Sequence, residues 1–324
     1  MKSGLIPLSL LLALSGCQPA PQKQSEPQAQ MAAPEVEVAT VVSFTEGPVV
    51  DADGNVYFSE TTSQRIMRLS VDGVLSTFRD NSNAANGLLF DEQWRLVACE
   101  GSRSNPRVTR TDRKTGKIEV LASKFDGKLL NAPNDVTIDG KGRLYFTDPI
   151  FTKVSEEHVG IPGVYRIDTD GKVSRILSGP DIQRPNGITI APDDRTLYLI
   201  EANSSEGGAR MIRAYDLSPD GTVSNMRVHY NFYPGRSADG MTIDSQGNIW
   251  AAAGLHRRRG TSETLDTKPG IHVISPQGKL LQYIPTHEDT ITNCAFGGPD
   301  MKTLYITAGK TLYRLRTNVA GTRR

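Results

Sequence analysis

Short apolar segments separated by polar turns fill most of the chain beyond residue 40, and no long stretch has helical periodicity. The segments are rich in β-branched and aromatic residues. Gly, Asp and Asn mark the turns between them, as in Asp53-Gly54 and Gln246-Gly247-Asn248. This alternation of short strand signals and turn residues predicts antiparallel β-structure throughout.

The strand pattern occurs six times, with a period of about 40–55 residues. In each repeat a polar residue with a side-chain oxygen precedes an apolar strand by ten or eleven residues. These polar residues are Glu46, Asn86, Asn134, Asn186, Asp239 and Asn293, and the apolar strands begin at Val56, Leu96, Leu144, Leu197, Ile249 and Leu304. Four strand signals per repeat predict an all-β fold, namely a six-bladed β-propeller with four-stranded antiparallel blades.

The two ends of the repeated region predict how the ring of blades closes. The last repeat has only three strand signals, and an apolar stretch at residues 36–43 precedes the first repeat. We expect this N-terminal strand to complete the last blade, which would remove the exposed edges of an open sheet. A solenoid is the alternative, but it needs capping repeats and gives no reason for a three-stranded final unit.

The first residues are typical of a secreted lipoprotein. A charged start, an apolar run and the sequence Leu14-Ser15-Gly16-Cys17 resemble a bacterial lipobox, so residues 1–17 are predicted to be a signal peptide with Cys17 as the lipidation site. Gln18, rather than Asp, follows the cysteine, and in this the sequence resembles lipoproteins that are sent to the outer membrane. We therefore expect a cell-envelope lipoprotein, in the outer membrane and facing the periplasm. The alternative is an ordinary signal peptide that contains a cysteine.

Residues 18–38 are rich in Pro and Gln and are predicted to be a solvated tether, and residues 39–318 are predicted to form the propeller. The formal net charge is only +1, with no basic stripe, which excludes a typical nucleic-acid binder. No feature indicates a protein partner. Cys99 and Cys294 fall in repeats that are not neighbours, so two buried thiols are expected rather than a disulfide.

In a propeller the innermost strands surround a channel, so the six polar residues should form a ring at one mouth. The second strand of each blade returns to the same mouth. A second tier of acids is therefore expected at its end in four blades, formed by Glu60, Glu100, Asp148 and Glu201.

The ring offers only oxygen ligands, without His or Cys. Carboxylates mixed with neutral amide oxygens suit Ca²⁺ best, with another divalent cation such as Mg²⁺, Mn²⁺ or Zn²⁺ as the alternative. Asn, Asp and Gly are also ordinary turn residues at strand starts, which is the competing explanation. Six polar residues in register, with acids behind four of them, favour the metal site.

Several segments resemble the gluconolactonase branch of the senescence-marker protein/gluconolactonase/luciferin-regenerating-enzyme family. They are Glu46-Gly47-Pro48, Leu130-Asn131-Ala132-Pro133-Asn134-Asp135, Tyr145-Phe146-Thr147-Asp148-Pro149, Arg184-Pro185-Asn186-Gly187, Asp239-Gly240-Met241 and Thr292-Asn293-Cys294. The resemblance implies a six-bladed propeller with Ca²⁺ at the channel mouth, held by Glu46, Asn134, Asn186 and Asp239. The pocket residues expected to bind substrate are Asn86, Asn131, Asp148 and Asn293. The chain departs from the family in having no arginine before Asn131, which leaves the identity of the substrate open.

The predicted activity is calcium-dependent hydrolysis of a small lactone or similar ester. The cation polarises the carbonyl, and a carboxylate assists the attacking water, with Asp239 as the first choice and Glu46 as the second. Two alternatives use the same site: a ligand- or protein-binding propeller with structural calcium, and a phosphotriester hydrolase. The basic run at 256–259 is predicted to be a solvated loop, or else a segment over the mouth that attracts an anionic substrate.

Overall fold

The computed structural model describes residues 35–323 together with Met1 and Gly4. The predicted signal peptide, the lipidation site Cys17 and nearly all of the tether lie outside the described residues. The propeller belongs to the unit Pro34–Arg324. Within the described part of the chain there is no helix, and hence none long and apolar enough to cross a membrane.

The fold consists of six four-stranded antiparallel sheets, as the repeat pattern predicted. Blade 1 contains β2 (Thr45–Val50), β3 (Val56–Glu60), β4 (Arg65–Leu69) and β5 (Leu75–Arg79). Blade 2 contains β6 (Ala85–Phe90), β7 (Leu96–Glu100), β8 (Arg107–Thr111) and β9 (Ile118–Ala122). Blade 3 contains β12 (Val136–Ile138), β13 (Leu144–Asp148), β14 (Gly163–Ile167) and β15 (Val173–Ser178).

Blades 4 to 6 repeat this arrangement. Blade 4 contains β16 (Pro185–Ile190), β17 (Thr196–Ala202), β18 (Arg210–Leu217) and β19 (Val223–Asn231). Blade 5 contains β20 (Ala238–Ile243), β21 (Ile249–Ala253), β22 (Gly270–Ile274) and β23 (Leu280–Pro285). Blade 6 contains β24 (Ile291–Gly297), β25 (Thr303–Ala308), β26 (Thr311–Arg316) and β1 (Glu37–Val41). A short additional hairpin, β10 (Lys124–Phe125) and β11 (Lys128–Leu129), precedes blade 3 and was not predicted.

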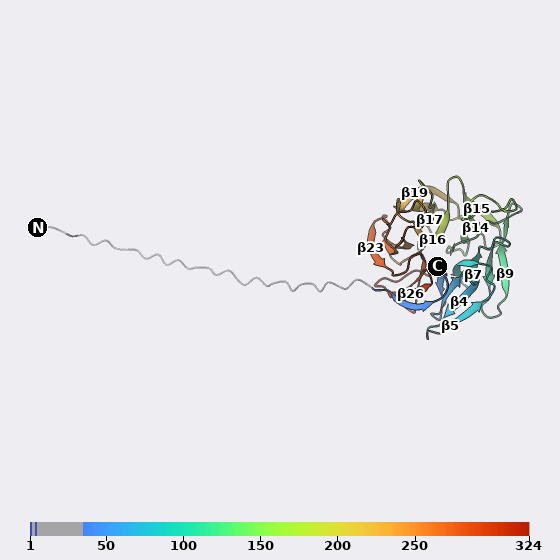
Figure 1. Ribbon diagram of the computed structural model, residues 1–324, viewed down its shortest axis with the longest axis horizontal. Helices are drawn as coiled ribbons and strands as arrows, with labels where there is room; N and C mark the ends of the chain where they lie inside the picture. The colour runs from blue at the N-terminus through green and yellow to red at the C-terminus, as the bar shows by residue number, and fades with distance from the viewer. Residues whose placement is uncertain (2–3, 5–34, 324) are drawn as a thin grey trace. The chain divides into compact units, whose positions relative to one another are not determined.

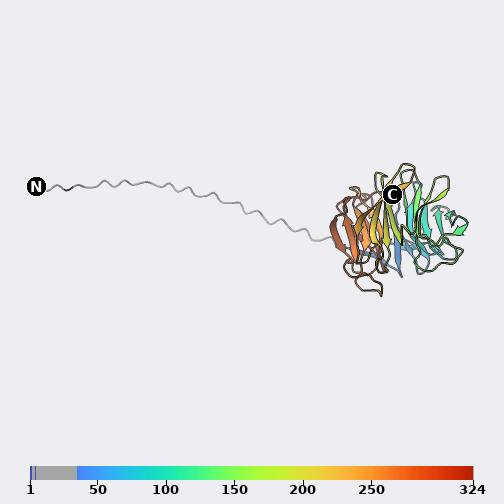
Figure 2. The same ribbon diagram turned by 90° about the horizontal axis from the view of Figure 1, so that it is seen from above.

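The innermost strands form a closed ring. Each of β2, β6, β12, β16, β20 and β24 contacts the innermost strands of both neighbouring blades. Figure 1 shows the blades of the propeller arranged around this centre, and Figure 2 shows their strands side by side from a perpendicular direction. The predicted closure is confirmed, because β1 pairs antiparallel with β26 and supplies the outer strand of blade 6.

The hydrophobic core is divided among the blade interfaces. Six buried clusters fill six interfaces; in one of them Tyr57 and Ile66 of blade 1 pack with Leu88 and Ala98 of blade 2. Because every sheet is covered on both faces, the second strands are apolar almost throughout rather than alternating. Cys99 and Cys294 are buried free thiols in two different clusters, as expected.

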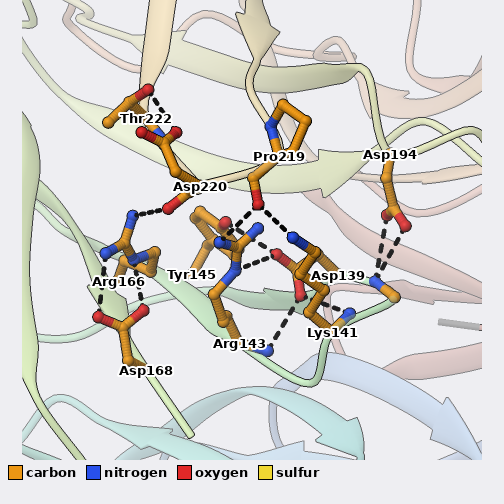
Figure 3. Close-up of polar contacts among 11 residues, drawn as sticks. Asp139, Lys141, Arg143, Tyr145, Arg166, Asp168, Asp194, Pro219, Asp220 and Thr222 are labelled. Carbon is orange, nitrogen blue, oxygen red and sulfur yellow. Dashed lines mark hydrogen bonds and ion pairs between the residues drawn. The ribbon is translucent and has the colours of Figure 1, made fainter.

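Blades are also joined by polar contacts at the end of the channel away from the ring. In blade 3, Asp139 accepts hydrogen bonds from the Arg143 Nε at 2.6 Å and from the Tyr145 hydroxyl at 2.9 Å. Lys141 and Arg143 both donate to the Pro219 carbonyl in the turn of blade 4 (Figure 3). Asp139 thus holds the turn of blade 3 together, and Lys141 and Arg143 link this turn to blade 4.

The predicted domain boundaries need small corrections. Residues 37 and 38 belong to β1 rather than to the tether, since Glu37 and Val38 pair with β26. At the other end, the chain beyond residue 318 still belongs to the propeller. Thr322 donates to the Ile243 carbonyl at the end of β20, and Gly321 donates to Met301.

Candidate functional site

The six ring residues lie at one mouth of the channel because the innermost strands are irregular there. The pairing register shifts between residues 46 and 49, 85 and 88, 185 and 188, 238 and 241, and 291 and 293. In blade 3, β12 begins only at Val136, directly after Asn134 and Asp135. A bulge changes the direction of a side chain at the start of a strand and is common beside functional sites. The repeated polar residue therefore marks a repeated bulge.

Glycines after the ring residues make room for side chains of the neighbouring blade. A Cβ on Gly87 would lie 2.3 Å from Oδ1 of Asp135, and a Cβ on Gly240 would lie 2.1 Å from Cγ of Asn293. Any other residue at these two positions would have to displace a polar side chain, and at Gly87 also the backbone of residues 134 and 135. Glycine is thus required at positions 87 and 240 because residues of the neighbouring blade approach the backbone too closely for a Cβ.

Asp135 is the site residue that the sequence prediction missed. It occupies the position at which four other blades have glycine, and its residue surface is only 6% exposed. One carboxylate oxygen accepts from the Val136 N–H at 3.0 Å and the other from the Ile188 N–H at 3.3 Å. Burial raises the pKa of Asp135 to about 7, and the charge of Asp239 adds to this effect. The break in the repeat, Asp in place of Gly, was the signal that could have identified it.

Glu46 and Asp239 are the predicted catalytic pair, and the structure brings them together. Glu46 is buried and the Asp239 side chain is 15% exposed, and burial is the first cause that raises the pKa of each. The pKa of Glu46 is raised further by the neighbouring charges of Asp239 and Asp135. Like charges at short range destabilise the ionised forms. The channel mouth therefore concentrates three acids whose charges are only partly compensated.

Asp239 is the most firmly oriented of these acids. Its Oδ1 accepts a hydrogen bond from the Asn186 Nδ2 at 2.7 Å, and its Oδ2 forms an ion pair with Nη2 of Arg236 at 2.7 Å. Asn186 and Asp239 were both predicted as metal ligands, and this contact places them side by side. Arg236 was not predicted, because it precedes the ring residue by three positions and has no counterpart in the repeat.

The remaining ring residues are also at the mouth. The carbonyl of Asn134 accepts from the Gly87 N–H at 2.7 Å, which joins blades 2 and 3 at the ring. The carbonyl of Asn86 accepts from the Ser59 hydroxyl at 2.6 Å. The side chain of Asn293 donates a hydrogen bond to Asp135, and its Oδ1 accepts one from the Cys294 N–H at 2.8 Å.

The second tier of acids has a different role from the one expected. The prediction that Asp148 and Asn131 contact substrate needs correction. Both residues have no exposed surface, and the Asp148 carboxylate accepts hydrogen bonds from the N–H groups of Asn131 at 2.8 Å and Ala132 at 2.7 Å. Asn131 in turn holds the loop after β13 by accepting from Gly160 and donating to Ile161. The pair positions a loop behind the site.

The donor set fits a hard divalent cation. The predicted ligands combine two carboxylates with two amides, and three acids share the mouth. Oxygen ligands of mixed charge are those that Ca²⁺ prefers, and a cation would offset the repulsion between the acids. Within residues 35–323, no three His, Cys, Asp or Glu side chains are arranged to hold a metal by themselves.

The basic run at 256–259 lies near enough to the mouth for one of its charges to act on Asp239. In the basic run, Arg257 and Arg258 are exposed, as predicted for a solvated loop. Arg259 instead contacts the Thr290 hydroxyl and approaches Asp289 to 3.7 Å. The positive charge of Arg259 also reaches Asp239 and helps to hold down the pKa of that carboxyl. The basic loop thus contributes one of its three arginines to the electrostatics of the site.

A six-bladed propeller with carboxylates and amides gathered at one channel mouth defines a class of protein suited to binding a cation and a small oxygen-rich molecule. The chain belongs to the SMP-30/Gluconolactonase/LRE-like family, whose model matches residues 44–310.

Three relatives illustrate the likeness. A gluconolactonase of Zymomonas mobilis is 29% identical over 313 residues, covering 88% of this chain and 81% of the relative. A pentonolactonase of Haloferax volcanii is 26% identical over 274 residues, covering 83% of each protein. The solved structure of a gluconolactonase from Xanthomonas campestris has a TM-score of 0.73 at 27% identity, covering 89% of this chain and 96% of that one.

Proposed function

We propose that the protein is a calcium-dependent hydrolase that opens lactones of the sugar-lactone type. The observation that carries the proposal is the channel mouth, where the buried Glu46 and the partly buried Asp239 lie beside asparagine amides and Asp239 is oriented by two hydrogen-bonded partners. The gluconolactonase and pentonolactonase relatives support the substrate class.

Glu46, Asn134, Asn186 and Asp239 would hold the cation. A bound Ca²⁺ supplies polarisation of the lactone carbonyl and increases the acidity of water at the site. The asparagines contribute neutral oxygens and the acids contribute charge, a balance that the mixed ring provides.

Asp239 is the carboxylate that we assign as proton acceptor. The contacts from Asn186 and Arg236 fix both of its oxygens and favour its ionised form. Water adds to the acyl carbon and loses a proton to this carboxylate. The bond from the acyl carbon to the ring oxygen then breaks, and the ring oxygen leaves as an alcohol that takes up the proton. Glu46 is the second candidate, because its two acidic neighbours favour its protonated form when no cation offsets them.

The proposal is tested with a panel of aldonolactones, aryl esters and aryl phosphotriesters, assayed with Ca²⁺ and with chelator. We expect lactones to be hydrolysed above the buffer rate only when the cation is present. Calcium binding without turnover of any compound would instead favour a ligand- or protein-binding propeller. Faster turnover of phosphotriesters than of lactones would favour the phosphotriester hydrolase.

We also propose that the mature protein is a cell-envelope lipoprotein in the outer membrane, on the basis of the lipobox-like sequence that ends at Cys17. A Cys17→Ser variant should be released into the soluble periplasmic fraction. Retention of this variant in the membrane fraction would contradict the assignment.

A further inference from the structure

The segment that carries Arg236 is held on several sides by contacts within the protein. The fully buried Arg210 donates from Nη1 to the Pro234 carbonyl at 2.7 Å, and Gly235 pairs with Thr264 of the loop after β21. The Ser237 hydroxyl donates to the Glu201 carbonyl at 2.7 Å. With its backbone fixed on both sides, Arg236 projects from a rigid support, as a precisely oriented binding group requires.

The guanidinium of Arg236 is only partly used by the protein. Its Nη2 pairs with Asp239, whereas its Nη1 is buried and has no hydrogen-bond partner among the described residues. The side chain is 14% exposed, so water has little access to it. A buried donor left without an acceptor destabilises the folded protein. At the channel mouth, a bound molecule can supply the missing acceptor.

The position of the free donor restricts what that acceptor is. Nη1 belongs to the same planar group as the nitrogen that contacts Asp239, so an acceptor of Nη1 lies within a few ångströms of that carboxylate. In the proposed reaction, Asp239 faces the attacking water. The oxygens closest to that water are those of the acyl carbon.

We propose that Arg236 is a further substrate-binding residue, whose Nη1–H donates to the acyl oxygen of the lactone. This inference rests on the proposed function. The acyl oxygen gains negative charge when water adds to the carbon, and after the ring bond breaks it becomes part of the product carboxylate. A donor that is fixed in advance stabilises the charged forms more than the neutral carbonyl, which lowers the barrier. Arg236 transfers no proton in this step.

Arg213 offers a matched control. It is also a buried arginine beside a carboxylate, since its Nη1 lies 3.3 Å from Glu201, and it likewise has one buried nitrogen without a partner. Arg213 lies on β18, the third strand of its blade, rather than at the innermost ring. A substitution there tests the cost of disturbing a buried ion pair without touching the channel mouth.

The experiment compares Arg236→Gln, Arg236→Lys and Arg213→Lys at saturating Ca²⁺, using the lactone that the wild type hydrolyses fastest. We expect Arg236→Gln to lower kcat/KM by roughly 10²–10³-fold, as removal of one oxyanion donor does. Arg236→Lys should recover part of this loss, and Arg213→Lys should stay close to the wild type. Calorimetry with CaCl₂ alone should show that Arg236→Gln binds the cation at least as tightly, because a positive charge has been removed.

Unchanged kcat/KM in Arg236→Gln at saturating Ca²⁺ would overturn the inference and leave Arg236 as a counter-ion of Asp239. Loss of calcium binding in that variant would also overturn it. If circular dichroism shows that Arg236→Gln is unfolded, the test uses Arg236→Lys instead. A kcat/KM below that of the wild type would then support the inference, and an unchanged kcat/KM would overturn it.

A separate measurement covers the case in which the wild type hydrolyses no lactone. The binding of gluconate, a hydroxy-acid anion of the product type, is then measured by calorimetry for wild type and variant. Tighter binding to the wild type than to Arg236→Gln would support the role of Arg236 although the proposed reaction had failed. Equal binding would overturn the inference.

Discussion

The acids of the channel mouth and the acids at the ends of the second strands lie close together in sequence but have opposite surroundings. Glu100, at the end of β7, contacts Arg79, the Arg107 Nε and the Thr109 hydroxyl. Glu201 at the end of β17 accepts from the N–H groups of residues 183 and 184 and lies beside Arg213. These acids are saturated with donors.

The mouth acids have fewer donors and more neighbouring charge. Glu46 accepts one backbone hydrogen bond, and its charged neighbours are Asp239 and Asp135, whose effect on its pKa Arg236 offsets in part. Asp239 has an arginine and an amide as partners. Identical side-chain chemistry therefore serves two purposes. Acids surrounded by donors hold loops in place, whereas in the proposed function the acids that repel one another serve cation binding and proton transfer.

The largest effect is expected from Asp239→Asn, which keeps the shape of a mouth acid but removes its charge. Turnover should fall by about 10³-fold or more because both the proposed base and a cation ligand are changed. A hundredfold excess of Ca²⁺ over its dissociation constant should stabilise the wild type by roughly 2.7 kcal/mol, and the variant much less. Thermal melts with and without Ca²⁺ measure this difference. Equal gains for both proteins would place the metal elsewhere.

Glu100→Ala changes an acid at the end of a second strand, and we expect it to lower stability without lowering kcat. Removing this carboxylate leaves Arg79 and Arg107 without their buried partner. Unfolding free energy should therefore fall by about 3–5 kcal/mol. Below its melting temperature the variant should keep the wild-type kcat and the same Ca²⁺-dependent gain in stability. A selective loss of kcat with unchanged stability would contradict the assignment of Glu100 to the scaffold.

Gly87→Ala tests whether Asp135 needs the space left by the missing Cβ at position 87. A Cβ there would lie 2.3 Å from the Asp135 carboxylate and 2.7 Å from the Asp135 Cα, so the acid and its backbone must move. We expect a loss of stability of about 1–3 kcal/mol, the usual cost of overpacking, together with reduced turnover. Gly101→Ala in the same blade is the control, since the nearest atom to its Cβ is 3.4 Å away. Equal effects of the two changes on turnover would show that Asp135 has no special role.

The smallest effect concerns the pH dependence of Asp148. Burial raises the pKa of this saturated acid to about 7, with no neighbouring acid among the causes. Because its pKa is higher in the folded state than in the unfolded state, protonation favours folding, and the contribution to stability is lost as pH rises from about 4 through 7. The difference in stability between wild type and Asp148→Asn should therefore shrink between pH 5 and pH 8. Chemical denaturation with chelator present measures it, and a growing difference would contradict the raised pKa.

Much of this architecture could be predicted because the repeat appears in the sequence at every level. The strand signals, the three-stranded last repeat and the N-terminal strand together specified the six blades and their closure, which the pairing of β1 with β26 confirms. The position of Glu46 and Asp239 at one mouth followed from the same periodicity. The role of Asp148 did not follow, because a strand-end acid can face either a channel or a loop.

The sequence by itself determined the ring, since equivalent positions in a propeller must meet at its axis whatever the loops do. Only the tertiary structure decided which acids face one another, because side-chain direction depends on each bulge and on neighbouring blades. Asp135 enters the channel because Gly87 of the adjacent blade leaves space for it. Asp148 is enclosed by backbone donors of the preceding loop. Arg236 reaches Asp239 because contacts from blade 4 and from the loop after β21 hold its segment in place. Such contacts join residues distant in sequence, and no local periodicity encodes them.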